Sequence, residues 1–131
     1  MERLSLKRAD ANKSLKSLQA VLQEPFSVIV RDAAIQRFEF TFEAFWKFTQ
    51  AYLREIEGKA INSPKACFRE LFASGLADEG QTEVLLRMTD RRNETAHTYK
   101  EGLAQAIFSE IGGFCALMTT VVKTLEKGMA R

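Results

Sequence analysis

Histidine, cysteine and proline are scarce in this chain of 131 residues, and the first two scarcities exclude whole classes of site. There is one histidine, His97, and the two cysteines, Cys67 and Cys115, lie far apart in the sequence. Such a set cannot form an intrachain zinc site, so we expect no metal centre. Both cysteines lie in apolar helical patterns, and the first residues lack the apolar centre of a signal peptide. We therefore expect reduced thiols in a cytoplasmic protein.

The sequence also lacks the motifs and long apolar runs that mark several other classes of protein. It has neither a Walker-type glycine loop nor a G-x-G-x-x-G motif, so we expect no bound cofactor. No run approaches the roughly 18 apolar residues that a membrane span needs, so we expect no membrane partner. The formal net charge is only +2, and attraction to nucleic acid would have to come from a local basic patch.

The apolar residues that are present recur at the spacing of α-helices. The only two prolines, Pro25 and Pro64, fall where helices are interrupted or begin, and no Asn-Gly or Asp-Gly turn separates alternating segments. The pattern predicts helices over residues 2–24, about 27–57, about 63–74, from 81 to about 92, and about 101–127. We therefore predict a single all-α domain over residues 1–131, an antiparallel four-helix bundle with one extra short helix.

The second predicted helix is apolar on two sides. One stripe consists of Ile35, Phe38, Phe42, Phe45, Thr49, Tyr52 and Ile56, and the other of Ile29, Ala33, Phe40 and Ala44. Because both sides must be covered, this helix is expected to be central in the bundle or part of a subunit interface, and we predict a homodimer. Between the stripes, Glu39, Glu43 and Lys47 recur every four residues. We interpret them as an exposed ladder of ion pairs, in preference to a charged line facing a cleft.

The first predicted helix has a basic face made by Lys7, Lys13 and Lys16. A face of this kind can contact RNA. We favour the simpler interpretation that it is a solvated helix surface.

The chemistry of this chain is concentrated in residues 90–99, which include Arg92, Asn93, His97 and Tyr99. On a continuous helix these four side chains share one sector, less than half the circumference wide. If the helix ends near Arg92, Asn93 caps the segment that follows and His97 lies in an irregular stretch. Either arrangement gathers a permanent cation, an amide, an imidazole and a phenol. This set suits phosphodiester chemistry, because arginine binds phosphate oxygens and imidazole moves protons near neutral pH.

A purely structural role explains the same residues without any chemistry. A histidine near a helix end can simply cap backbone carbonyls. The local arginines, Arg87, Arg91 and Arg92, are also balanced in part by Asp90 and Glu94, so the patch is only mildly basic.

Arg92, four intervening residues, His97, one residue and Tyr99 form the pattern R-x4-H-x-Y. This pattern resembles the signature of HEPN domains, and specifically of their nucleotidyltransferase substrate-binding branch. The match includes a polar residue directly after the arginine and a small residue before the histidine. Residues 35–47, with the sequence IQRFEFTFEAFWK, are similar to the second helix of that branch, so the resemblance extends from about residue 31 to residue 123.

The resemblance implies an all-α bundle that dimerises and brings two copies of the motif together. Many HEPN domains are metal-independent endoribonucleases. In toxin–antitoxin pairs of this branch, a small nucleotidyltransferase is the antitoxin and adds AMP to the motif tyrosine. Carried onto this sequence, Arg92 and His97 are catalytic, Asn93 supports them and Tyr99 is modified. Other members of the branch serve only as non-catalytic partners of the transferase.

These residues leave three hypotheses. The first is a HEPN-type ribonuclease toxin subunit that acts on RNA as a homodimer and is controlled by a cognate small nucleotidyltransferase. The second is a nucleotidyltransferase substrate-binding subunit that performs no chemistry. The third is a structural bundle in which His97 is only a cap. A neighbouring gene for a small nucleotidyltransferase would support the first two hypotheses and weaken the third.

Overall fold

The computed structural model describes residues 2–130, and within that range the chain is helical with no β-strand. Its elements are α1 (Glu2–Leu22), α2 (Val28–Glu55), α3 (Pro64–Ala73), α4 (Glu79–Glu94), the 3₁₀ turn η1 (Thr95–His97) and α5 (Glu101–Met129). The all-α bundle of four long helices and one short helix is therefore confirmed. The predicted helix ends are right to within about two residues.

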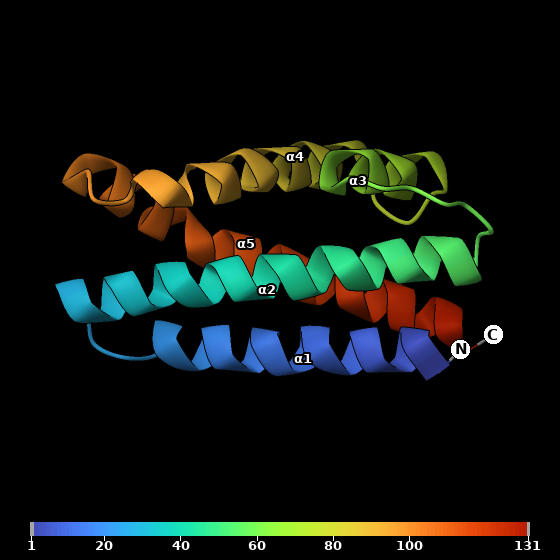
Figure 1. Ribbon diagram of the computed structural model, residues 1–131, viewed down its shortest axis with the longest axis horizontal. Coiled ribbons are helices and arrows are strands. Elements are labelled where there is room, and N and C mark those ends of the chain that lie inside the picture. Colours follow the sequence, from blue (N-terminus) through green and yellow to red (C-terminus); the bar gives the residue numbers. More distant parts are fainter. Residues whose placement is uncertain (1, 131) are drawn as a thin grey trace.

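Helix α2 is the centre of the bundle. In Figure 1, α1 runs antiparallel to α2 on one side, α3 and α4 lie along the opposite side, and α5 passes behind α2. α2 contacts each of the four other helices. Of the two alternatives that the sequence left for this helix, the central position in the bundle is therefore confirmed. The start of α2 and the turn between α4 and α5 lie at the same end of the molecule, opposite the chain termini (Figure 1).

Side-chain caps and glycines set the helix ends. Ser27 caps α2 by accepting a hydrogen bond from the Val30 amide at 3.0 Å. Asp78 and Gln81 form a capping box at the start of α4, so this helix begins two residues earlier than predicted. Gly58 follows α2 with a φ of 71°, a conformation that is strained for any residue with a side chain and that ends the helix.

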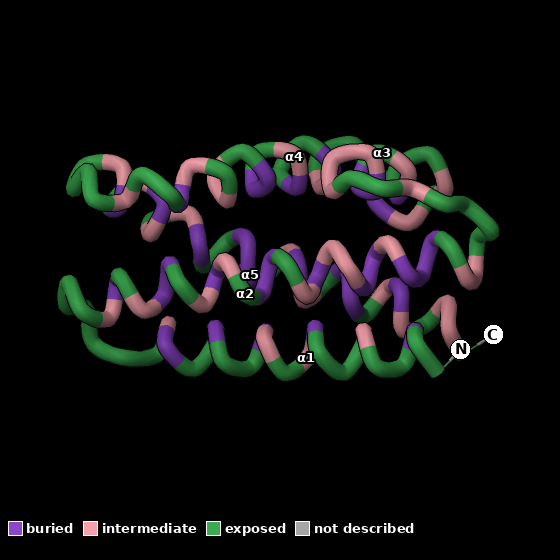
Figure 2. Tube along the Cα trace, viewed as in Figure 1, coloured by how far each residue is buried: buried purple, intermediate pink, exposed green. Residues whose placement is uncertain are grey.

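The buried side of α2 is the first of the two predicted stripes. Phe38, Phe42, Phe45 and Tyr52 are buried against the other helices, and Figure 2 shows the buried residues facing the interior of the bundle. Phe38 stacks on Phe114 of α5 with ring centroids 5.7 Å apart. Truncating a phenylalanine in such a core to alanine costs about 3–5 kcal/mol, so these rings dominate the stability of the bundle.

The second predicted stripe of α2 is not covered inside the protomer. Ile29 is 82% exposed and Phe40 is 56% exposed, whereas Ala33 and Ala44 are half-buried. Single exposed apolar residues are ordinary on protein surfaces. Their alignment along one side of the central helix leaves the subunit-interface interpretation of this stripe open.

The expectation that no segment has the hydropathy of a membrane span is wrong for α5. By length and composition alone it qualifies, with a mean hydropathy of 1.4 over an 18-residue window. Core helices of bundles share this property. The apolar residues of α5 include the buried row Ile107, Ile111, Phe114 and Met118, which packs into the bundle core.

Candidate functional site

The residues of the R-x4-H-x-Y motif lie on the end of α4 and the turn that joins it to α5. α4 continues through Arg92 and Asn93 to Glu94, His97 ends the 3₁₀ turn, and Tyr99 follows just before α5. Of the two arrangements that the sequence allows, the structure is closer to the one in which the helix ends near Arg92. Asn93 does not cap the following segment, because it is an exposed residue inside α4, and the helix ends at Glu94 with Thr95 as its C-cap.

Two threonine hydroxyls hold the shape of this turn. Thr95 Oγ1 donates to the Arg92 carbonyl at 2.7 Å, and Thr98 Oγ1 donates to the Thr95 carbonyl at 3.0 Å. The Lys100 amide then donates to the His97 carbonyl at 3.1 Å. These bonds add to the backbone bonds of the turn, in which the Thr95 amide donates to the Arg92 carbonyl and the Thr98 amide donates to the Thr95 carbonyl. Neither threonine was singled out from the sequence, although their position after a predicted helix end was a usable signal.

His97 and Tyr99 both face solvent. Their ring centroids are 6.1 Å apart in an edge-to-face arrangement, and Tyr99 is 77% exposed. Within residues 2–130 the His97 imidazole makes no hydrogen bond, so the structure gives no support to its role as a helix cap. An exposed imidazole and an exposed phenol are both open to a macromolecular partner or substrate.

Arg92 lies beside the polar line of α2. Its Nη2 is 4.0 Å from Glu43 Oε2, and its buried Nε has no hydrogen-bond partner among the described residues. A buried guanidinium donor without a partner is costly unless a ligand satisfies it. The side chain as a whole is 35% exposed, so Arg92 is accessible to a ligand at the edge of the motif, although its Nε is not.

The predicted ladder of ion pairs on α2 is wrong. Glu43 accepts a hydrogen bond from Trp46 Nε1 at 3.2 Å and faces Arg92, and Lys47 lies over the Trp46 ring at 5.0 Å. Within residues 2–130 Glu43 and Lys47 form no salt bridge with each other. The alternative interpretation, a charged line facing a functional surface, describes Glu43 better.

The other two arginines near the motif are tied to α5. Arg87 Nε and Arg91 Nε donate to the two carboxylate oxygens of Glu110 at 2.5 and 2.6 Å. The hydrogen bond from Arg87 is the main cause that lowers the pKa of Glu110 below its ordinary value. Arg91 Nη1 also lies 3.4 Å from Glu94 Oε1, so two carboxylates balance these two arginines. Arg92, with a single 4.0 Å contact to Glu43, is the arginine of this cluster most available to a ligand.

A buried arginine fixes the far side of the same turn. The Arg31 side chain is only 4% exposed, and its two terminal nitrogens donate to the Glu101 carboxylate at 2.7 and 2.9 Å. The hydrogen bond from Arg31 lowers the pKa of Glu101. This fork joins the start of α2 to the first residue of α5, two residues after Tyr99. Arg31 was not singled out from the sequence, although it occupies a buried helical position four residues before Ile35.

The structure brings some of the predicted site residues together and leaves others apart. Tyr99 lines a hollow of about 440 Å³ against the polar side of α2, with Asp32, Gln36 and Glu39. Arg92 lies one turn further along α2, at Glu43. No hydrogen bond joins Arg92 to His97 in the described part of the chain. One protomer therefore presents the motif as an open, exposed edge.

Neither cysteine adds reactivity to this edge. Cys67 and Cys115 are both free and buried, and burial raises the pKa of the Cys67 thiol to about 11. Burial also raises the pKa of Cys115. Within residues 2–130, no group of three or more His, Cys, Asp or Glu side chains is arranged to hold a metal ion.

Comparison with known proteins identifies related sequences. A model of the family described as "Nucleotidyltransferase substrate binding protein like" matches residues 6–127. The chain is also 34% identical over 101 residues to a Haemophilus influenzae protein named probable ribonuclease HepT. That alignment covers 72% of this chain and 66% of the relative, slightly less than two thirds of its length.

Solved structures share the fold. A crystal structure of a Thermus thermophilus protein matches with a TM-score of 0.85 at 46% identity, covering 88% of this chain and 98% of that one. A mutant of the toxin–antitoxin MntA-HpeT matches with a TM-score of 0.78 at 16% identity, covering 97% and 99%. A Haemophilus influenzae protein, described as having the fold of a nucleotidyltransferase substrate-binding domain, matches at 0.64 and 21% identity, covering 95% and 98%. At these low identities, the last two show a common fold alone.

Proposed function

The chain belongs to the family of nucleotidyltransferase substrate-binding proteins, and from this premise we propose that it is a HEPN-type toxin subunit. In this proposal it is a metal-independent endoribonuclease controlled by a cognate small nucleotidyltransferase antitoxin. The observation that carries the proposal is the exposed edge that presents the partly exposed Arg92 side chain and the unbonded His97 imidazole. The relative named probable ribonuclease HepT supports it.

The proposed reaction is transfer of the RNA phosphodiester to the neighbouring 2′-hydroxyl. His97 takes the proton from the 2′-hydroxyl, and the 2′-oxygen forms a bond to phosphorus as the bond to the 5′-oxygen breaks. The leaving 5′-oxygen takes a proton from a second acid. Arg92, whose side chain is 35% exposed, donates to the phosphate oxygens and stabilises the charge that gathers there. Asn93, exposed on the preceding helical turn, supports the binding of the substrate.

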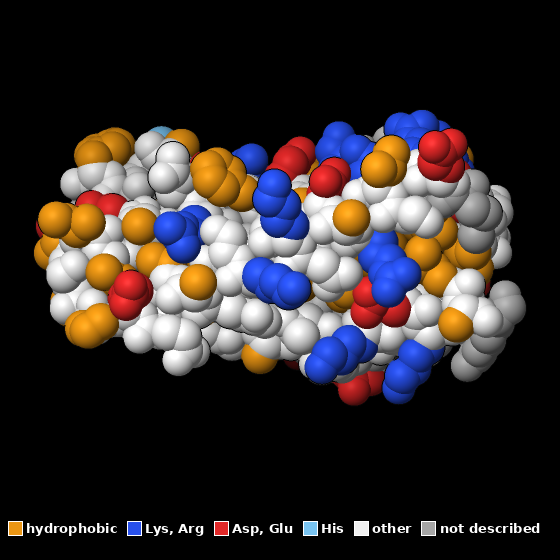
Figure 3. Space-filling view, turned by 90° about the horizontal axis from the view of Figure 1, so that it is seen from below, with side chains coloured by type: hydrophobic (Ala, Val, Ile, Leu, Met, Phe, Trp, Pro, Cys, Tyr) orange, Lys and Arg blue, Asp and Glu red, His pale blue; other side chains and the backbone are white. Residues whose placement is uncertain are grey.

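A dimer supplies the two proton-transfer groups that this reaction needs. One histidine per chain cannot easily remove one proton and deliver another in the same step. The apolar end patch, made by Phe26, Val28 and Ile29, lies where α2 begins, at the end of the bundle that also holds the motif turn. Figure 3 shows hydrophobic side chains gathered at this end. A second copy seated there would place two motifs near one another.

We predict a homodimer that depends on the apolar end patch. Light scattering should give twice the chain mass of 14.8 kDa at micromolar concentration, and Ile29→Asp should give the mass of one chain. Ile29 is exposed, so a charge there costs little within a protomer but is buried unpaired in the interface. Phe72→Asp is the matched control, because Phe72 is also exposed but lies on α3. A monomeric native protein would contradict the dimer and the two-histidine site with it.

The ribonuclease proposal predicts cleavage without added metal. Purified protein should cut a single-stranded RNA in the presence of a chelator, because arginine and histidine perform the chemistry that a metal ion performs elsewhere. The product ends should be a 2′,3′-cyclic phosphate and a 5′-hydroxyl, read by mass spectrometry. Intact RNA after incubation with the folded dimer would reject the enzymatic proposal.

A non-catalytic substrate-binding subunit is the second candidate. The family description, which names substrate binding and no cleavage, favours it. In that case the exposed motif edge would serve as the docking surface for the transferase. A stable complex with the cognate transferase, together with an absence of cleavage, would select this candidate.

A further inference from the structure

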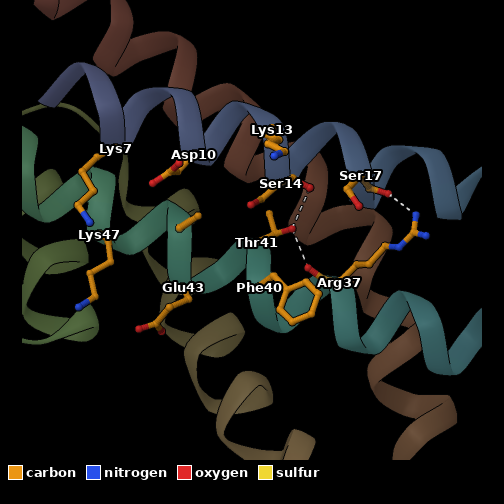
Figure 4. A pocket seen from close by; sticks show the side chains of 11 residues that line it. Lys7, Asp10, Lys13, Ser14, Ser17, Arg37, Phe40, Thr41, Glu43 and Lys47 are labelled. Atoms are coloured by element: carbon orange, nitrogen blue, oxygen red, sulfur yellow. Dashed lines mark hydrogen bonds between the residues drawn. The ribbon is translucent and has the colours of Figure 1, made fainter. Parts of the chain in front are cut away.

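A groove between α1 and α2 is the largest hollow among those described above, with a volume of about 750 Å³. Figure 4 shows the side chains that line it: Lys7, Asp10, Lys13, Ser14 and Ser17 from α1, and Arg37, Phe40, Thr41, Glu43 and Lys47 from α2, with Ala44. From Lys7 to Ser17 the groove follows α1 for about 15 Å along the helix axis. The groove is long and open, so it fits an extended chain better than it fits a small molecule.

The positive charges in the α1–α2 groove are only half balanced by carboxylates. Within residues 2–130, Lys7, Lys13 and Lys47 form no salt bridge, and Arg37 donates only to the Ser17 carbonyl, at 2.9 Å. Two carboxylates, Asp10 and Glu43, face four cations. Other cations of the protein are paired with carboxylates. For example, Arg31 pairs with Glu101, and Lys59 pairs with Glu70. The groove therefore concentrates the local basic charge that the whole chain lacks.

An exposed aromatic ring lies among these charges. Phe40 is 56% exposed and lines the groove, and in Figure 4 its ring lies between Arg37 and Glu43. An exposed ring beside an arginine provides a face on which a nucleobase can stack while the cations of the groove hold the adjacent phosphates. A rigid duplex hides its bases inside its stack and cannot use such a ring, whereas a single strand can.

The groove reaches the motif through Glu43. This residue lines the groove, and its carboxylate is 4.0 Å from Arg92 Nη2. A polyanion lying in the groove would therefore end beside Arg92, whose side chain is 35% exposed.

We propose that the α1–α2 groove binds the backbone of single-stranded RNA and guides it to Arg92. Lys7, Lys13 and Lys47 hold phosphates, and Phe40 stacks a base. The proposal rests on the ribonuclease function proposed above and adds to it a binding site outside the motif. It also replaces the earlier interpretation of Lys7 and Lys13 as a solvated face.

The test is RNA binding in a variant that cannot cleave. A fluorescein-labelled oligouridylate is titrated with His97→Ala protein, and anisotropy is recorded across a series of salt concentrations. Adding Lys7→Gln, Lys13→Gln and Lys47→Gln should weaken binding by about fivefold per lost contact at 0.1 M salt. The slope of log affinity against log salt should fall by about 2 for the three contacts together.

A charge-matched control separates the groove from general attraction. Arg69→Gln, Lys123→Gln and Lys127→Gln remove the same charge from exposed positions on α3 and α5. This control should keep the slope of the His97→Ala protein. Equal binding and equal slopes for the two triple variants would overturn the proposal, as would the absence of RNA binding by the His97→Ala protein. Unchanged RNA binding with lost binding to the purified cognate transferase would also overturn it, and would assign the groove to a protein partner.

The two proposals fail in different ways. If the native protein does not cleave RNA but the groove variant loses binding, the ribonuclease proposal is wrong and the groove proposal stands. For cleavage, the substitutions Lys7→Gln, Lys13→Gln and Lys47→Gln are made in the native protein, which keeps His97. If this groove variant and the native protein cleave a long RNA with the same KM, the groove proposal is wrong and the ribonuclease proposal stands. In the expected case the groove variant raises KM for a long RNA and leaves cleavage of a dinucleotide unchanged.

Discussion

Cleavage of single-stranded RNA should fall by about 10²- to 10⁴-fold when His97 is replaced by alanine. This is the loss expected when a positioned proton-transfer group is removed. The His97 side chain is exposed and makes no hydrogen bond within residues 2–130, so His97→Ala should leave the free energy of unfolding within about 0.5 kcal/mol of the native value. Initial rates on a labelled RNA and a thermal melt followed by circular dichroism measure the two effects.

Arg92→Ala should cost cleavage about 10²- to 10³-fold, because it removes charge stabilisation at the reacting phosphate. The neighbouring Arg91 is the matched control. Its guanidinium is held by Glu110 at 2.6 Å, so Arg91→Ala removes the same charge one residue away without touching the exposed edge. Equal cleavage rates for the native protein and His97→Ala would reject the enzymatic role. Equal losses of cleavage for Arg91→Ala and Arg92→Ala would show that only the local charge matters, and not the position of Arg92.

Addition of AMP to Tyr99 should silence the ribonuclease completely. The phenol is 77% exposed and its ring lies 6.1 Å from the His97 ring, so a transferase can reach it and the added group lies beside the motif. AMP brings a phosphate with about one negative charge, which pairs with nearby cations, and an adenylate that obstructs access for RNA. Because the modified side chain projects into solvent, the bundle itself should not unfold.

Co-expression with the cognate nucleotidyltransferase, followed by intact-mass and peptide analysis, tests this regulation. A mass increase of one or more AMP units should map to Tyr99 and should be absent from Tyr99→Phe. The second tyrosine, Tyr52, is an internal control, because it is buried in the core and inaccessible to a transferase. If an active transferase with ATP leaves the chain unmodified, the regulatory mechanism is wrong, although cleavage and complex formation could both survive.

The helices and their ends were readable in the sequence because their causes are local. Ser27 caps the helix that follows it, and Gly58 ends the same helix in a conformation that favours glycine. The spacing of Phe38, Phe42 and Phe45 identified one buried face of α2. The R-x4-H-x-Y pattern likewise located the candidate site, because its residues are close in sequence.

The contacts across helices could not be read in this way. Periodicity shows that a face is buried but not which helix covers it, so the pairing of Arg31 with Glu101, 70 positions away, had no local signal beyond the burial of Arg31. The same reasoning misassigned Glu43, which faces Arg92 across the α2–α4 contact instead of pairing along its own helix.

The sequence by itself determined the helical elements and the chemical set of Arg92, Asn93, His97 and Tyr99, and it left the central position of α2 as one of two alternatives. Only the tertiary structure decided which charges are free. Packing places Arg87 and Arg91 against Glu110 and leaves Arg92 Nε, together with Lys7 and Lys13 in the α1–α2 groove, without a partner in residues 2–130. The physical reason is that a charge is neutralised by proximity in space, and the crossing of helices sets that proximity.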